Sequence, residues 1–189
     1  MLAAAFPEFV DPNPSTNNKF GESITVLSNG NVVVTSVWDD TGAVTNTGAV
    51  YLYNGQTGAL ISTLRGSATN DNVGGGGIVA LSNGNFLVLS PDWGVNDFGA
   101  LTWVNGTTGL SGTVSSTSSL VGNPLSDKVG RGGNVAVLTN GNYVTRTSNW
   151  DNGSTINVGA VTWGSGTTGI SGTISAANSL IGSTVSDNV

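Results

Sequence analysis

A threefold internal repeat is the feature of this sequence that most constrains its fold. Each copy holds an apolar run after an Asn-Gly pair, a loop with Trp and Asp, a Gly-Ala strand start and a Gly-rich turn. The copies lie within 28–58, 82–109 and 139–169. A repeat of this length is one supersecondary unit that buries its apolar face against its neighbours. We therefore expect one continuous array, although the length would suit one or two ordinary domains.

The junctions between copies set the unit boundaries. They begin at Asn18, Asp71, Asp127 and Asp187 and read NKFG, DNVG, DKVG and DNV. The resulting units, of about 53–60 residues, are 18–70, 71–126 and 127–189, the last including the start of a further junction.

The first 17 residues differ from the repeat. Several prolines exclude a helix there. We expect residues 1–17 to be either a disordered leader or a short edge strand built on Phe6, Phe9 and Val10, because proline is tolerated at a sheet edge.

Each unit contains four candidate strands. In the second unit these are Ile78–Leu81, Phe86–Ser90, Ala100–Val104 and a fourth that follows Gly109, runs through Val114 and ends near Leu120. An Asn-Gly pair supplies the positive φ angles of a tight hairpin between the first two. The sequence predicts an all-β protein of three four-stranded antiparallel units, arranged as β-propeller blades. The alternative is a β-solenoid, in which neighbouring units pair strands.

Three blades are too few for a closed ring, because propellers have about 4–8. The repeat register coincides at Asn18 and Asp187. We therefore predict head-to-tail self-association, most simply a homodimer with a six-bladed ring. The same register fits an excised or engineered propeller fragment that self-assembles.

Composition excludes several classes of function. The net charge is −6, and the five basic residues form no phosphate-binding stripe, which disfavours nucleic acid and anionic membranes. No apolar run approaches the roughly 20 residues of a spanning helix. Without Cys or His there is no disulfide, no thiolate metal site and no histidine general base. We expect any export signal to lie outside this sequence, because the opening MLAAAF is too short for one.

The run SNGN…W-D…GAV-T-W-G-x-G-TTG-x-SG…NSL-x-G-S resembles repeats of bacterial haemagglutinin-like surface proteins, most closely across 150–182. The Phe20-Gly21 start and the later Gly-Ala pair resemble, more distantly, FG-GAP repeats of integrin-type propellers. These resemblances imply a propeller fold, a secreted or cell-surface location in a bacterium, and adhesion without enzymatic activity. The calcium loop of integrin-type blades has no counterpart, since the corresponding positions read SNGN or TNGN.

The loops with Trp and Asp are the candidate ligand sites. An indole that stacks on a sugar, beside Asp and Asn that bind its hydroxyls, is a carbohydrate-binding arrangement. The competing interpretation is that each Trp wedges between units and each Asp caps a turn. In the middle unit Asp precedes Trp, so we align Trp93 one residue out of register with the other two tryptophans. The candidate residues are Trp38, Asp39, Asp40, Asp92, Trp93, Trp150, Asp151 and Asn152.

Two further sets of residues have a structural and a functional interpretation. The junction acids Asp71, Asp127 and Asp187 suit either calcium or a structural role, as an Asx-type turn or as a bond across the unit interface; no other cofactor is expected. Trp103 and Trp163, which match Leu52 in the first unit, are expected to be core.

Catalysis is the least favoured interpretation. A glycosidase needs two carboxylates about 5–10 Å apart, and the pairs Asp39–Asp40 and Asp92–Asp97 do not repeat between units. We expect a non-enzymatic module for adhesion or structural display, with a carbohydrate-binding lectin that uses the Trp-Asp loops as the alternative.

Overall fold

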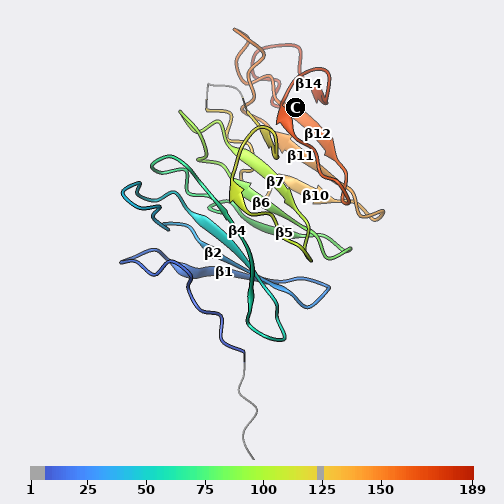
Figure 1. The fold of residues 1–189 in the computed structure, drawn as a ribbon. Helices are drawn as coiled ribbons and strands as arrows, with labels where there is room; N and C mark the ends of the chain where they lie inside the picture. The colour runs from blue at the N-terminus through green and yellow to red at the C-terminus, as the bar shows by residue number, and fades with distance from the viewer. Residues whose placement is uncertain (1–6, 123–125) are drawn as a thin grey trace, which may run out of the picture.

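The computed structural model describes residues 7–122 and 126–189. Its strands form three sheets of four or five strands, which lie one above another in chain order (Figure 1). Phe6 and the rest of residues 1–6, together with 123–125 of the second unit, lie outside the described residues. The prediction of an all-β repeat protein is confirmed.

Unit 1 is an antiparallel meander. Its strands are β1 (Phe20–Val26), β2 (Val32–Ser36), β3 (Ala49–Tyr53) and β4 (Leu60–Arg65). Tight turns join β1 to β2 and β3 to β4, and the longer Trp loop, residues 37–48, joins β2 to β3. The first turn is Asn29-Gly30, where Gly30 has a φ of +85° and its N–H donates to the Leu27 carbonyl at 2.9 Å. This is the hairpin that the Asn-Gly pairs predict.

Units 2 and 3 repeat the first three strands of the meander. Unit 2 contains β5 (Gly77–Ala80), β6 (Phe86–Ser90), β7 (Ala100–Val104), β8 (Gly112–Thr113) and β9 (Ser119–Val121). Unit 3 contains β10 (Val135–Val137), β11 (Tyr143–Thr147), β12 (Ala160–Gly164), β13 (Gly172–Thr173) and β14 (Ser179–Ile181). The predicted second and third strands of unit 2 match β6 and β7 residue for residue, and the first begins one residue earlier than predicted.

The fourth predicted strand of unit 2 is wrong, because the structure divides it between two sheets. Its first part, β8, leaves unit 2 and pairs in parallel with β4 of unit 1, while β9 completes its own sheet against β7. Unit 3 does the same, since β13 pairs in parallel with β9 and β14 pairs with β12. The sheets are therefore mixed, in the orders β1-β2-β3-β4-β8, β13-β9-β7-β6-β5 and β10-β11-β12-β14.

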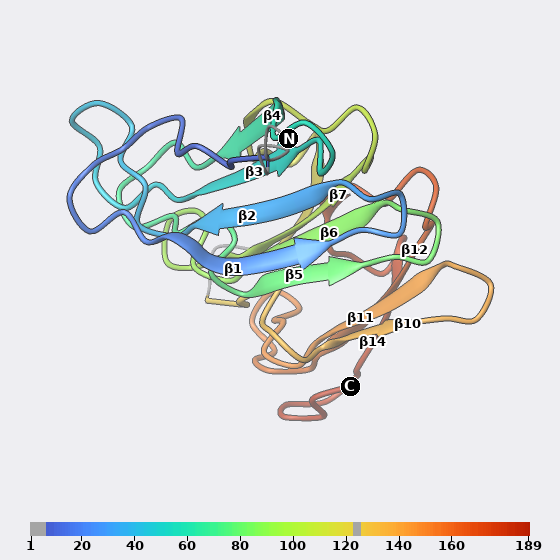
Figure 2. The same ribbon diagram turned by 90° about the horizontal axis from the view of Figure 1, so that it is seen from below.

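Apolar side chains fill the space between successive sheets. One core cluster combines Val33 and Leu52 of unit 1 with Val88 of unit 2. A second combines Leu87 and Leu120 of unit 2 with residues of unit 3. β2 and β6 are buried along their whole length, as expected for continuous apolar runs covered on both faces. Units thus stack face to face and also exchange strands. Figure 2 shows β1 and β5 side by side at one edge of the stack.

Residues 7–17 form no strand, so the edge-strand alternative is wrong for Phe9 and Val10, whereas Phe6 lies outside the described residues. The ring of Phe9 lies 5.4 Å from the ring of Tyr53, and the Tyr53 hydroxyl donates to the Val10 carbonyl at 2.7 Å. We call residues 8–13 the leader cap, because they pack on the face of unit 1 that a preceding unit would otherwise cover.

Candidate functional site

Backbone hydrogen bonds correct the predicted alignment of the Trp loops. The amides of Trp93 and Trp150 donate to the last residue of the preceding strand, and their carbonyls accept from Gly99 and Gly159. In unit 1 the residue with these two bonds is Asp39, whose amide donates to Ser36 and whose carbonyl accepts from Gly48. The register of Trp93 and Trp150 is therefore the same, and Trp38 is the residue that is displaced by one position.

The two equivalent tryptophans are packing residues. Trp150 is 2% exposed and belongs to the core between units 2 and 3. Trp93 is half-buried against the core between units 1 and 2. Each thus packs toward the preceding unit, as the wedge interpretation predicts.

Asp39 occupies the same position in unit 1, where no preceding unit is present in the described chain. Its carboxylate is fully buried and accepts hydrogen bonds from the Tyr51 hydroxyl and the Asn13 side chain. Burial, followed by the hydrogen bond to Asp39, raises the pKa of Tyr51 far above its ordinary value. Asn13 belongs to the leader cap, so a polar network replaces the Trp wedge where a preceding unit would pack.

Trp38 has an exposed indole, with 43% of its surface accessible. It lines an open hollow of about 460 Å³ together with Thr16, Asn17, Asp40, Thr45 and Asn46. Asp40 Oδ1 accepts from the Asn46 amide at 2.8 Å. The Lys19 ammonium lies 3.6 Å from the centre of the Trp38 ring, so one indole face already carries a cation–π contact. This hollow is where the structure brings an exposed aromatic ring, a carboxylate and an amide together.

Two of the candidate residues of unit 3, Asp151 and Asn152, make hydrogen bonds within their own loop. Asp151 Oδ1 accepts from the Asn157 amide at 2.6 Å, the same bond that Asp40 makes in unit 1. Asn152 is exposed and bridges to Thr155 through its main chain. The two do not converge with Trp150, whose ring is buried.

Asp92 lies at the position of Trp38 and faces a cation. Lys128 Nζ lies 3.5 Å from Asp92 and 3.1 Å from Asp97. The hydrogen bond to Asp97 is the largest cause of the raised pKa of Lys128. An ammonium between two half-exposed carboxylates is a surface ion-pair network, and it neutralises the acid pair that catalysis would need.

The junction acids accept backbone N–H groups. Asp71, the first residue of unit 2, accepts at Oδ2 from the Ser67 and Ala68 amides at the end of unit 1, and at Oδ1 from the Gly94 amide of unit 2 at 3.0 Å. Asp127 likewise accepts from the Asp151 amide of unit 3 at 3.2 Å. Asp71 therefore closes the loop that precedes it and connects that loop to unit 2, which is the predicted bond across the unit interface and not an Asx turn, whose bond runs to the amide two residues on. Within residues 7–122 and 126–189 no three acidic side chains gather into a metal-binding group.

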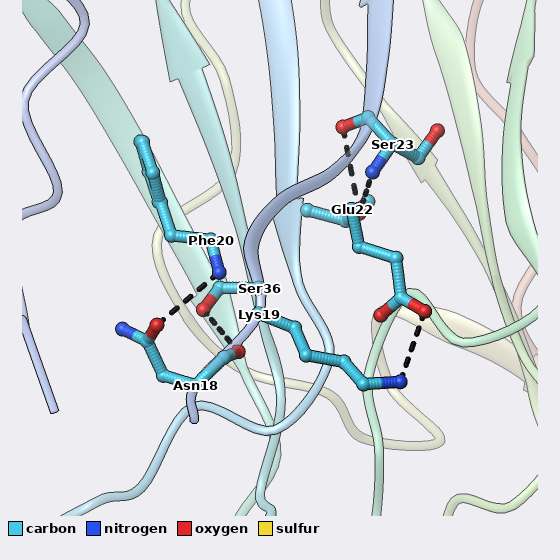
Figure 3. Close-up of polar contacts among 7 residues, drawn as sticks. Asn18, Lys19, Phe20, Glu22, Ser23 and Ser36 are labelled. Carbon is cyan, nitrogen blue, oxygen red and sulfur yellow. Dashed lines mark hydrogen bonds and ion pairs between the residues drawn. The ribbon is translucent and has the colours of Figure 1, made fainter. Parts of the chain in front are cut away.

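Asn18 takes the junction position in unit 1 (Figure 3). Its side-chain oxygen accepts from the Phe20 amide at 3.2 Å, and its carbonyl accepts from the Ser36 hydroxyl at 2.8 Å. Its amide nitrogen donates to Asp11 of the leader cap at 2.6 Å. The residues on either side, Asn17 and Lys19, have positive φ angles, as do their counterparts at the other three junctions.

The mid-strand tryptophans face the following unit. Leu52 is buried beneath unit 2, and Trp103 is half-buried and donates from Nε1 to the Gly166 carbonyl of unit 3 at 3.1 Å. Trp163 is 53% exposed, so its predicted place in the core is wrong in this chain. The reason is that the described structure contains no unit beyond it.

Sequence reasoning missed Asn13 and Asp11, which bind unit 1 from the leader cap. The sequence signal that could have indicated them is that both are Asx residues within a proline-rich segment. Such a segment is equally typical of a disordered chain.

The described part of the chain contains no helix with the length and apolarity needed to cross a membrane. A search of curated proteins finds no relative that matches this sequence. A family described as a repeat of unknown function (DUF5650) matches three times, at residues 26–75, 80–131 and 137–189. These three matches overlap the three structural units one by one and cover most of the chain, which therefore belongs to that repeat family.

Proposed function

We propose that the chain is a non-enzymatic structural module of a secreted or surface-displayed bacterial protein, serving adhesion or display. The observation that carries the proposal is the exchange of strands between units. β8 and β13 each leave their own unit and extend the preceding sheet, which ties every unit to its neighbour by main-chain hydrogen bonds. Such a stack suits a rod or platform, because its stability grows with nearest-neighbour contacts.

The arrangement of carboxylates supports a role without catalysis. Asp39 is engaged by Tyr51 and Asn13, Asp71 by three backbone amides, and Asp92 by Lys128. Each carboxylate thus serves a loop, a junction or an ion pair.

For the architecture, the four-stranded antiparallel meander and the contact between β1 and β5 support propeller-type blades. The parallel strand exchange supports the solenoid alternative. The arrangement that accommodates both is a stack of blade-like units.

A carbohydrate-binding role is the second candidate, favoured by the hollow beside Trp38. An indole with Asp40 and Asn46 beside it offers a stacking face and polar groups to a sugar. A sugar there would have to share or displace the Lys19 contact.

Glycan-array binding and a hydrolysis screen, with the whole chain and two variants, separate these candidates. Trp38→Ala removes the exposed ring from the hollow, and Trp163→Ala removes an equally exposed ring at the far end of the stack. The structural role predicts no glycan binding and no hydrolysis. Binding that is lost in Trp38→Ala and kept in Trp163→Ala would establish the lectin role instead, and turnover of any glycan would overturn the non-enzymatic role.

A further inference from the structure

The outer face of unit 3 corresponds to the face of unit 1 that unit 2 covers and to the face of unit 2 that unit 3 covers. We propose that this face, formed by β14 with Trp163 and Leu180, docks a further repeat of the same family, which adds its Gly-Thr segment to β14 as a parallel strand. The inference rests on the proposed structural role and names the partner of that role.

The interface to be reproduced occurs twice in the molecule with one geometry. Leu64 and Arg65 of β4 pair with Gly112 and Thr113 of β8, and the Val114 amide donates to the Arg65 carbonyl at 3.0 Å. In the next interface β9 pairs with β13 in the same register, and the corresponding main-chain bond is again 3.0 Å. β14 has the same place in unit 3 as β4 and β9 have in theirs, and its outer edge is unpaired in the described chain.

Side-chain exposure distinguishes the open face from the covered ones. Leu64 is 2% exposed and Leu120 is 0% exposed, whereas Leu180 at the equivalent position is 75% exposed. Trp163 and Val185 are exposed as well. Leu180 and Trp163 border an apolar hollow of about 390 Å³, which is also lined by Val144, Val161, Ala176 and Ala177. Covering such apolar side chains contributes roughly 25 cal/mol per Å² of buried area.

Asparagine side chains at the open face of unit 3 lie where they could donate hydrogen bonds to the same partner, a further repeat. Asn29 and Asn31 donate to the Gly106 carbonyl of unit 2, and their counterparts in unit 2 donate to the Gly166 carbonyl of unit 3. Asn140 and Asn142 repeat this pair in unit 3, where their amide nitrogens have no partner among the residues that the structure describes.

The acid of the last junction, Asp187, also lacks the backbone donor that the other junction acids have. Asp71 and Asp127, which begin units 2 and 3, each accept from a backbone amide in the Trp loop of the unit that they begin. The equivalent oxygen of Asp187 accepts from its own Thr184 hydroxyl at 2.5 Å. A docked repeat would supply the backbone donor, as Gly94 and Asp151 do for the first two junctions.

The first unit of a second copy of this chain does not fit the face. Unit 1 joins β3 to β4 by a tight hairpin and has no Gly-Thr segment to offer, and β8 and β13 are already paired. The leader cap also covers its outer face: a Cβ on Gly58 would lie 2.6 Å from the Glu8 carbonyl oxygen. The equivalent Gly109 and Gly169 meet side chains of the preceding unit in the same way. The stack therefore has one closed end and one open end.

A peptide of residues 165–175, SGTTGISGTIS, added to the whole chain, provides the probe. NMR spectra should show shifts at the Leu180 and Ile181 resonances and at the Trp163 indole N–H, while sedimentation shows a monomer. Leu180→Asp should reduce the shifts to those seen with a scrambled peptide. Val26→Asp, at an equally exposed residue in unit 1, should leave them unchanged.

A second arm adds another copy of residues 130–189 after Val189, because Asp187–Val189 already correspond to Asp127–Val129. The Trp163 indole should then become as protected as that of Trp103, and its fluorescence should shift to the blue. The proposal is overturned if neither arm changes Trp163 and Leu180, or if the unmodified chain dimerises with concomitant burial of Trp163. Glycan binding at Trp38 would overturn the proposed function without affecting either result, because Trp38 lies at the other end of the stack.

Discussion

Asp39 and Trp150 occupy the same position in two different units. Each donates its amide to the end of the second strand, and each accepts the N–H of the glycine that opens the third strand. Trp150 packs against a preceding unit, whereas Asp39 binds Asn13 of the leader cap. One position thus carries an apolar wedge inside the stack and a polar anchor at its closed end.

This relationship predicts different costs for removing the three loop tryptophans. Trp150→Ala should lower the free energy of unfolding by about 3–5 kcal/mol, because it empties a buried site. Trp93→Ala should lower the free energy of unfolding by a smaller amount, since the Trp93 ring is half-buried. Trp38→Ala should change the free energy of unfolding by less than about 0.5 kcal/mol, as expected of an exposed side chain. Urea unfolding measures all three, and equal losses in Trp38→Ala and Trp150→Ala would contradict the alignment.

The junction acids give a comparison between covered and open interfaces. Asp71→Ala leaves three backbone amides without their acceptor and should cost roughly 1–3 kcal/mol. Asp187→Ala removes an exposed carboxylate at the open end and should cost clearly less. Thermal unfolding of the two variants tests this, and an equal loss of stability would show that the bond from the Gly94 amide to Asp71 contributes nothing.

Position 99 requires glycine because the backbone of the next junction lies close to it. A Cβ there would lie 2.2 Å from the Val129 nitrogen, and φ is +74°. Gly99→Ala should therefore cost clearly more than the roughly 1–2 kcal/mol of a left-handed backbone alone. Gly153→Ala is the matched control, because its φ is +62° and no atom lies within 4 Å of its added Cβ. Similar unfolding midpoints for the two variants would show that the junction adapts.

Alkaline pH should unfold the chain through its buried tyrosines. Burial, with a smaller contribution from the Asp11 charge, raises the pKa of Tyr53 to about 12, and burial likewise raises the pKa of Tyr143. An unfolded tyrosine ionises near 10, so the folded state holds more protons above that pH. Stability is then complete below pH 10 and falls as the pH rises toward 12. Tyrosinate absorbance should appear together with the loss of structure. Ionisation of Tyr53 near pH 10 in a folded chain would contradict this.

The sequence predicted the local structure where a residue type demands one conformation. Asn29-Gly30 and its two counterparts determine the first hairpin of each unit, and the runs Phe86–Ser90 and Ala100–Val104 were predicted to the residue. These predictions succeed because turn chemistry and apolar runs act over a few residues.

The sheet that each short fourth strand joins was not predictable from the same patterns. The short segment Gly112–Thr113 has no local signal that assigns it to the sheet of unit 1. Its role depends on the position of the neighbouring unit, which sequence periodicity does not give. The five or so residues that unit 1 lacks here were visible in the sequence, and they correspond to the segment that in unit 2 leaves its own sheet to pair with β4.

The candidate site was recognised in part. Trp38, Asp40 and the junction acids were named from the sequence, but the alignment of the tryptophans was out of register because it matched residue types and not backbone positions. Asn13 was missed because its function depends on the fold of unit 1, 26 residues away in sequence from Asp39.

Amide hydrogen exchange at Val114 and Ile174 is the most direct test of the interlocked stack. These two amides donate across unit boundaries to the carbonyls of Arg65 and Val121. The account predicts that they exchange as slowly as the core amides of β6, because opening them requires separation of two units. Exchange as fast as at the exposed loop residue Gly42 would show that β8 and β13 do not join the neighbouring sheets, and would contradict the account.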